Sequence, residues 1–175
     1  MRRPITLFSA ILSLTLLAAC SSQPAAPEQN ASGVEDRSGR DVLNPVDTAG
    51  MYNPARLKDP KSSLSKREIY FDLDSYAIRS EFKPLLEQHA KFLQANGKYR
   101  MLIQGNADER GSREYNLALG QKRAEAVRKA LQLLGANEAQ VEAVSLGKEK
   151  PRCTESTEEC WAQNRRADIL YTGEF

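Results

Sequence analysis

The sequence has few of the residues that perform nucleophilic, metal-assisted or acid–base chemistry near neutral pH. It contains one histidine, His89, and three cysteines among 175 residues. A Ser-His-Asp or Cys-His site needs a histidine beside its nucleophile, and a closed zinc site needs four ligands. His89 falls on the apolar face of a predicted helix, where we expect a hydrogen-bonded core histidine. The residues therefore predict no enzyme activity, no metal site and no bound cofactor.

The sequence also has little excess charge of either sign. It holds 25 basic and 23 acidic residues, and the first 19 residues contain two arginines and no acid. Without those 19 residues the chain has 23 of each, so it is neutral. A neutral chain has no overall basic field to attract nucleic acid, and we expect no nucleic-acid partner.

The one long apolar run, residues 5–17, is too short to be a membrane-spanning helix. It follows Arg2 and Arg3 and ends in Leu17-Ala18-Ala19-Cys20, which is typical of a signal peptide over residues 1–19. These last four residues resemble the lipobox of bacterial lipoproteins. The resemblance implies a lipid on Cys20, with several acyl chains giving stable anchoring, and Ser21 favours the outer membrane. The alternative is an ordinary secretory signal that happens to contain a cysteine.

The two remaining cysteines, Cys153 and Cys160, are close together in the sequence. In an oxidising compartment such a pair favours a disulfide, and a ring of about eight residues would contribute roughly 2.5 kcal/mol through loop entropy. A metal site is the alternative, with His89 far away in the sequence. We predict the disulfide, and we expect Trp161 to pack beside it.

Composition divides the rest of the chain in two. Residues 20–64 are rich in Ser, Pro, Ala, Gly, Asn and Asp and show no sustained period, which predicts a lipidated N-terminus followed by a flexible, disordered linker. Residues 65–175 have the periodicity and size of one folded domain.

Within this domain, strands and helices alternate. Strands are expected at 69–73, 99–104, 143–146 and 166–171, and helices at 80–95 and 112–134, with a short helical turn at 138–141 and a polar loop before the last strand. This order predicts an α/β (α+β) domain with helices packed on one mixed four-stranded sheet. Right-handed crossovers would make the first three strands parallel in sense.

The stretch 105–124 contains the most distinctive group of polar residues. Asp108 lies between a predicted strand and a predicted helix, a position where ligands bind in α/β folds. Asn116, Leu119 and Arg123 share one side of that helix. A carboxylate that accepts from an ammonium group and a guanidinium that matches a carboxylate would together suit a small zwitterion. The alternative is structural: Asp108 would satisfy turn amides, and Arg123 would pair with it or with Glu109 at the surface.

Three motifs narrow these alternatives. IYFDLDSY at 69–76, GNADERGSREYNLALGQKRAEAV at 105–127 and NRRADI at 164–169 occur in order. Residues 66–172 closely resemble the OmpA-like domain of the peptidoglycan-associated lipoproteins. This resemblance implies a βαβαββ domain that binds peptidoglycan non-covalently. It assigns Asp108 to the ammonium group and Arg123 to the carboxylate of the diaminopimelate in the stem peptide.

The same resemblance assigns further residues to the pocket. Secondary positions are Arg110, Asn116 and Leu119, and the turn after the first strand contributes Leu73 and Asp74. Leu73 stands where the family usually has Phe, so the wall there keeps an apolar contact but loses a ring. The segment 164–166 either contacts the ligand or supports the pocket from behind.

The resemblance also implies a cellular role. The protein would be a lipid-anchored outer-membrane protein whose domain faces the periplasm and tethers the membrane to peptidoglycan. It would act in the Tol-Pal system, with TolB and other Tol proteins as partners, in envelope integrity and cell division. One alternative is a periplasmic protein-interaction module that does not bind the wall. Another is an envelope hydrolase, in which Asp74 and Asp108 would form a carboxylate pair.

Overall fold

The computed structural model describes residues 48–175. The predicted signal peptide and Cys20, the predicted site of lipid attachment, lie outside the described residues. Among residues 48–175, no helix has both the length and the apolar character required to cross a bilayer.

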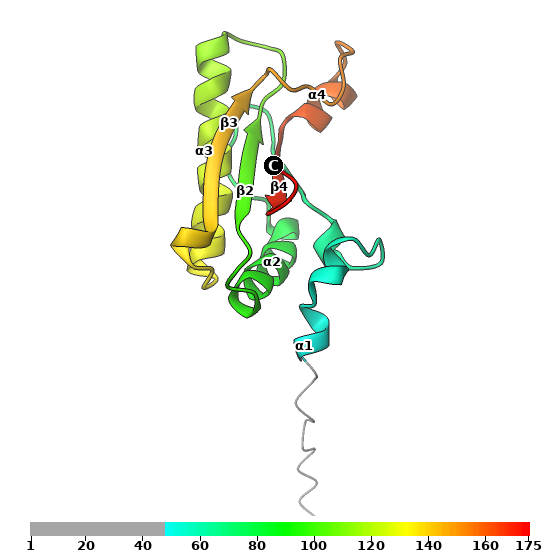
Figure 1. Ribbon diagram of the computed structural model, residues 1–175. Coiled ribbons are helices and arrows are strands. Elements are labelled where there is room, and N and C mark those ends of the chain that lie inside the picture. The colour runs from blue at the N-terminus through cyan, green and yellow to red at the C-terminus, as the bar shows by residue number, and fades with distance from the viewer. Residues whose placement is uncertain (1–47) are drawn as a thin grey trace, which may run out of the picture. The chain divides into compact units, whose positions relative to one another are not determined.

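A four-stranded mixed sheet forms the centre of the domain (Figure 1). Its spatial order is β1-β4-β2-β3, and the strands are β1 (Glu68–Tyr70), β2 (Met101–Asn106), β3 (Val141–Gly147) and β4 (Arg166–Tyr171). β4 lies antiparallel to both β1 and β2, whereas β2 and β3 are parallel. The first three strands therefore run in the same direction, which confirms the mixed sheet expected from the sequence.

Helices α2 (Lys83–Ala95) and α3 (Arg113–Leu133) pack against this sheet. The apolar stripe of α2 is buried with the inward side chains of the central strands, in a core that includes Leu86, Phe92, Ile103 and Ile169. A single turn of 3-10 helix, η3 (Ser80–Phe82), precedes α2. Because Arg79 holds the capping position of this turn, Ser80 is not the N-cap that we expected.

Several strand boundaries differ from the sequence prediction: β2 begins at Met101 instead of residue 99, and β3 extends over Val141–Gly147 instead of 143–146. The short turn η4 (Glu138–Gln140) lies before β3 as expected. β1 ends at Tyr70, since the chain turns away from the sheet before Leu73. Between β3 and β4, where we expected only a polar loop, the structure has an additional short helix, α4 (Glu158–Asn164). The side chain of Thr157 caps α4 by accepting from the amide of Cys160 at 3.3 Å. A local cap of this kind carries no hydrophobic period, so periodicity did not reveal the helix.

The folded domain also begins earlier than residue 65. The described part of the expected linker contains α1 (Thr48–Met51) and two 3-10 turns, η1 (Pro54–Leu57) and η2 (Ser63–Ser65). Leu57 and Leu64 are buried in the main core. Arg67 donates to the carbonyl of Leu57 at 2.8 Å. The flexible-linker prediction is therefore wrong for this part, because two isolated leucines can join a core without forming a periodic pattern.

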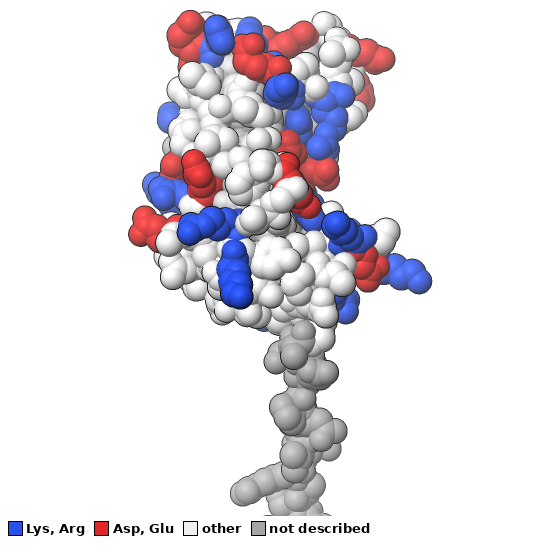
Figure 2. Space-filling view, in the orientation of Figure 1, with Lys and Arg blue, Asp and Glu red and all other residues white. Residues whose placement is uncertain are grey.

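Close contact between β2 and α3 sets the position of the second helix. A Cβ added to Gly105 would lie 1.8 Å from the carbonyl oxygen of Gly120, so only glycine allows this approach. Ser112 caps α3 by accepting from the amide of Tyr115 at 3.1 Å, as the sequence predicted. The loop between β2 and α3 is therefore short and fixed at both ends. On the face shown in Figure 2, acidic and basic side chains are interspersed.

Candidate functional site

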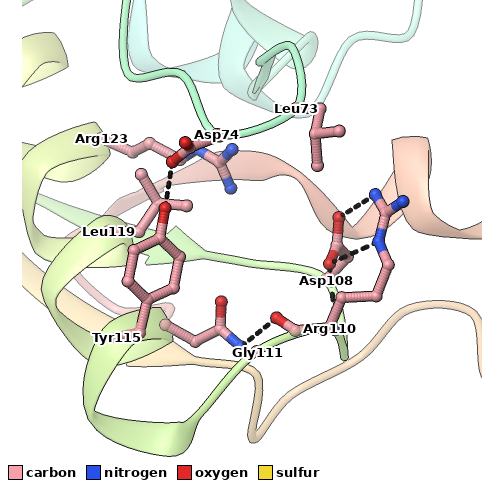
Figure 3. Close-up of a pocket in the computed structure, with 9 residues that line it drawn as sticks. Leu73, Asp74, Asp108, Arg110, Gly111, Tyr115, Leu119 and Arg123 are labelled. Atoms are coloured by element: carbon pink, nitrogen blue, oxygen red, sulfur yellow. Dashed lines mark hydrogen bonds and ion pairs between the residues drawn. The ribbon is translucent and has the colours of Figure 1, made fainter.

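A cavity of about 310 Å³ lies at the loop between β2 and α3, and the turn after β1 closes one side of it. Its lining residues come from three segments: Leu73, Asp74, Asp108, Arg110, Gly111, Tyr115, Asn116, Leu119 and Arg123. All seven residues that the sequence singled out are in this set. In Figure 3, Asp108 and Arg110 lie on one side of the cavity, and Arg123, Asp74 and Tyr115 lie on the other.

Arg123 is fully buried, and backbone carbonyls hold its guanidinium. Its Nε donates to Ser75 at 2.8 Å, its Nη1 to Asn106 at 2.8 Å, and its Nη2 to Asp72 at 3.1 Å. Burial lowers the pKa of Arg123 to about 10, so the group stays cationic at neutral pH. Three of its five N–H groups are used in this way, and two remain for a ligand.

These contacts correct the structural alternative for Arg123. It pairs with neither Asp108 nor Glu109. Instead it ties the turn after β1 to the end of β2, and it lies 5.3 Å from the centre of the Phe71 ring. Arg123 thus fixes the shape of the cavity and supplies its buried positive charge.

Asp108 is 5% exposed and already accepts four hydrogen bonds. Arg110 provides three: its amide at 3.1 Å, Nε at 3.2 Å and Nη2 at 2.8 Å. Arg165 provides a longer one at 3.5 Å. Burial raises the pKa of Asp108, but the hydrogen bonds and charges of these arginines outweigh it and hold the pKa below its usual value. Asp108 is therefore an anion whose acceptor positions are occupied by internal cations.

Asn116 and Tyr115 connect α3 to the loops around the cavity. Asn116 Nδ2 donates to the carbonyl of Arg110 at 2.8 Å. Tyr115 donates from its hydroxyl to the carboxylate of Asp74, which raises the pKa of Tyr115. Asp74 adopts a left-handed backbone conformation, with φ of 52°, and this conformation turns the chain over the cavity.

The apolar walls are unequal. Leu119 is 8% exposed and forms part of the interior, whereas Leu73 is 59% exposed at the rim. Leu73 therefore offers only a small, open apolar contact at the rim.

The disulfide predicted between Cys153 and Cys160 is confirmed, with a Cα–Cα distance of 5.3 Å. The segment 164–166 contributes no lining residue to the cavity. Asn164 accepts from the amide of Arg152 at 2.7 Å, and Arg165 supports Asp108 from behind. This arrangement matches the supporting role rather than direct contact with a ligand.

Two lining residues, Tyr115 and Gly111, were not predicted. Tyr115 lies four residues before Leu119 on the same helix, so helical spacing could have revealed it. The contact between Trp161 and Arg110 was also missed: the Arg110 guanidinium carbon lies 4.1 Å from the centre of the Trp161 ring. These residues are 51 positions apart in the chain, and no local pattern relates them.

Comparison with known proteins gives this cavity a family context. The model of the OmpA family matches residues 70–165, which include every lining residue. The chain belongs to the OmpA family, among its peptidoglycan-associated lipoproteins. The family assignment and the fold expected from the sequence are thereby confirmed.

Several individual proteins support this membership. The chain is 37% identical to the peptidoglycan-associated lipoprotein of Pseudomonas putida over 158 residues, which cover 90% of this chain and 91% of the relative. It is 42% identical to that of Brucella melitensis over 125 residues, covering 71% and 74%. The crystal structure of the peptidoglycan-associated lipoprotein from Burkholderia pseudomallei is similar with a TM-score of 0.66 and 60% identity, covering 66% of this chain and 98% of that one.

Proposed function

We propose that the protein binds peptidoglycan through this cavity, which holds the free end of the diaminopimelate residue in a stem peptide. The observation that carries the proposal is that Asp108 and Arg123 face one small cavity from opposite sides (Figure 3). Its four charged lining residues are two acids and two arginines. Their charges cancel, which suits a zwitterionic group better than a simple anion or cation. The names of the relatives cited above, peptidoglycan-associated lipoproteins, support peptidoglycan as the polymer that is bound.

In this proposal the two charged ends of the ligand have different partners. The ligand carboxylate accepts from the free N–H groups of Arg123, whose burial removes competing water. The ligand ammonium approaches Asp108 from the cavity and shares its carboxylate with Arg110, which keeps its own hydrogen bonds to it. Arg110 stays in place because its Nη1 also lies 3.6 Å from a second carboxylate, that of Glu158. Binding is reversible and involves no chemical change in the ligand.

The wider role follows from the family and the N-terminal sequence. A lipid on Cys20 would hold the chain at the outer membrane while the domain grips the wall in the periplasm. In this proposal the protein also binds TolB and other proteins of the Tol system. Through them it contributes to envelope integrity and cell division.

The experiment is sedimentation of the purified full chain with isolated peptidoglycan sacculi. Asp108→Asn keeps the shape of the side chain but removes its charge, and we expect it to lower pelleting at least ten-fold, a loss of about 1.4 kcal/mol in binding. Glu87→Gln, the same change on the exposed side of α2, is the matched control and should pellet like the wild type. Equal pelleting of Asp108→Asn and wild type would refute the proposed site.

Two further measurements separate the alternatives. Release of soluble muropeptides from the sacculi would identify a hydrolase instead of a binding protein. A Cys20→Ala chain should leave the membrane fraction yet still pellet with sacculi, because the anchor and the cavity are separate parts. Loss of pelleting by the folded, unanchored chain would contradict this modular arrangement.

A further inference from the structure

The segment closed by the disulfide packs against the loop that carries the cavity's acid. We define the bridged segment as residues 153–161, which are the ring closed by the Cys153–Cys160 disulfide and the adjacent Trp161. Its Ser156 hydroxyl donates to Glu109 Oε1 at 2.8 Å, and the Trp161 indole N–H donates to the same oxygen at 2.9 Å. Glu109 lies between Asp108 and Arg110 in the chain, so the bridged segment holds this loop from outside the cavity.

Trp161 also holds Arg110 itself. The guanidinium carbon of Arg110 lies 4.1 Å from the centre of the indole ring, which is the geometry of a cation–π contact. Arg110 is 35% exposed at its side chain, and without this contact water would surround much of it. Asp108 and Glu158 bind the guanidinium from its edges, at 2.8 and 3.6 Å, while the indole contacts its face. Trp161 does not line the cavity, so any effect on a ligand must act through Arg110.

The disulfide explains how a surface segment can hold an indole in place. Trp161 lies on α4, a helix of seven residues. A helix this short is not stable by its own hydrogen bonds and depends on its surroundings. The bridge joins Cys160, which is 1% exposed, to Cys153 on the preceding loop. The covalent link thereby limits the positions that the neighbouring Trp161 can reach.

We propose that Trp161, fixed by the Cys153–Cys160 bridge, is a positioning residue that holds Arg110 at the cavity and so sets the affinity of the site. This inference rests on the proposed function and adds residues that do not themselves contact the ligand. The bridged segment keeps Arg110 in the orientation in which it donates to Asp108 and lines the cavity.

The test is a double-mutant cycle between Trp161 and Arg110, with sacculus affinity of the full chain as the measurement. Trp161→Ala should weaken binding about two- to five-fold, the size of an exposed cation–π contact. Trp161→Phe keeps an aromatic face and should stay within about two-fold of wild type. In an Arg110→Ala background, Trp161→Ala should cause no further loss, since the residue through which it acts is gone. Changing both bridge cysteines to alanine should weaken binding in the same direction as Trp161→Ala.

The chain's single tryptophan provides a second, ligand-free measurement. A cation stacked on the indole alters its fluorescence, so Arg110→Ala should shift the emission of Trp161. Arg113→Ala is the matched control: this arginine is 74% exposed, pairs with Glu149 and should leave the emission unchanged. The bridge variant should shift the emission as Arg110→Ala does.

The possible outcomes distinguish the two proposals. If wild type pellets and Asp108→Asn does not, but Trp161→Ala binds like wild type, only the positioning role is refuted. Equal losses from Trp161→Ala with and without Arg110 would likewise refute it, because the effect would be a general structural one. If wild type fails to pellet, the proposed function fails, and with it any influence of Trp161 on affinity. If the emission of Arg110→Ala is also unchanged, the contact between Trp161 and Arg110 is refuted as well.

Discussion

Replacing Arg123 by lysine separates the charge of this residue from its hydrogen bonds. Lysine keeps the positive charge but concentrates it at one ammonium group, whereas the guanidinium of Arg123 reaches three carbonyls in different directions. These carbonyls belong to Asp72 and Ser75 in the turn after β1 and to Asn106 at the end of β2. The substitution therefore tests whether the buried cation organises the cavity as well as charging it.

The structure sets the expected size of the effect. A lysine ammonium in this space can replace one of the three hydrogen bonds, so two are lost. Hydrogen bonds to charged groups contribute about 1.5 kcal/mol or more each, and their loss should lower the free energy of unfolding by about 3 kcal/mol. For a domain of this size, that corresponds to a fall in melting temperature of about 10 °C.

Thermal unfolding followed by circular dichroism measures the first effect, and sacculus binding well below the transition measures the second. Arg128→Lys is the matched control, because Arg128 is on the same helix but forms a partly exposed ion pair with Glu125 at 2.7 Å. Such pairs contribute about 0–1 kcal/mol, so its melting temperature should fall by no more than about 4 °C. An Arg123→Lys variant that melts like wild type would refute the claim that these hydrogen bonds hold the loops together.

Three further changes test the core, the helix contact and the rim. Burial lowers the pKa of His89 from 6.5 to about 4, so the unfolded chain takes up a proton first as pH falls. This should reduce the free energy of unfolding by about 3 kcal/mol between about pH 7 and 4. Denaturant titrations should show this dependence of stability on pH in the wild type and not in His89→Gln. Gly105→Ala forces a Cβ to within 1.8 Å of the Gly120 carbonyl and should cost about 3 kcal/mol, whereas Gly97→Ala, with nothing within 4 Å, should change stability by less than about 0.5 kcal/mol. Leu73→Phe should strengthen sacculus binding about three-fold by adding an aromatic wall.

Each of these predictions has an outcome that contradicts it. A titration slope that persists over the same acidic range without His89 would assign it to other groups. Equal stability of the two glycine variants would mean that β2 and α3 can separate without cost. Unchanged affinity in the Leu73 variant would place the rim outside the ligand's reach.

The sheet, the two long helices and the side of α3 that lines the cavity were largely predictable because their signals are local. Apolar spacing marked the buried faces of α2 and α3, and Ser112 marked the start of α3. Helical geometry placed Asn116, Leu119 and Arg123 on one side. The motif around Asp108 then related these positions to a known family.

Other features depended on contacts between distant parts of the chain. Leu57 and Leu64 enter the core from a segment with no period, and α4 depends on a side-chain cap and the disulfide. The sequence also did not reveal which charged groups of the site pair with each other. The spacing suggested that Asp108 and Arg123 could be partners. In the structure Arg110 and Arg165 neutralise Asp108, while carbonyls from the turn after β1 and from the end of β2 bind Arg123.

The sequence by itself determined which side of α3 carries Asn116, Leu119 and Arg123, because the helical period fixes the side on which a residue lies. Only the tertiary structure decided which groups pair there. Pairing depends on how close loops from different parts of the chain come, and hydrogen bonds act over about 3 Å. That is why the stacking of Trp161 on Arg110 emerged only when residues 51 positions apart were brought to within 4.1 Å.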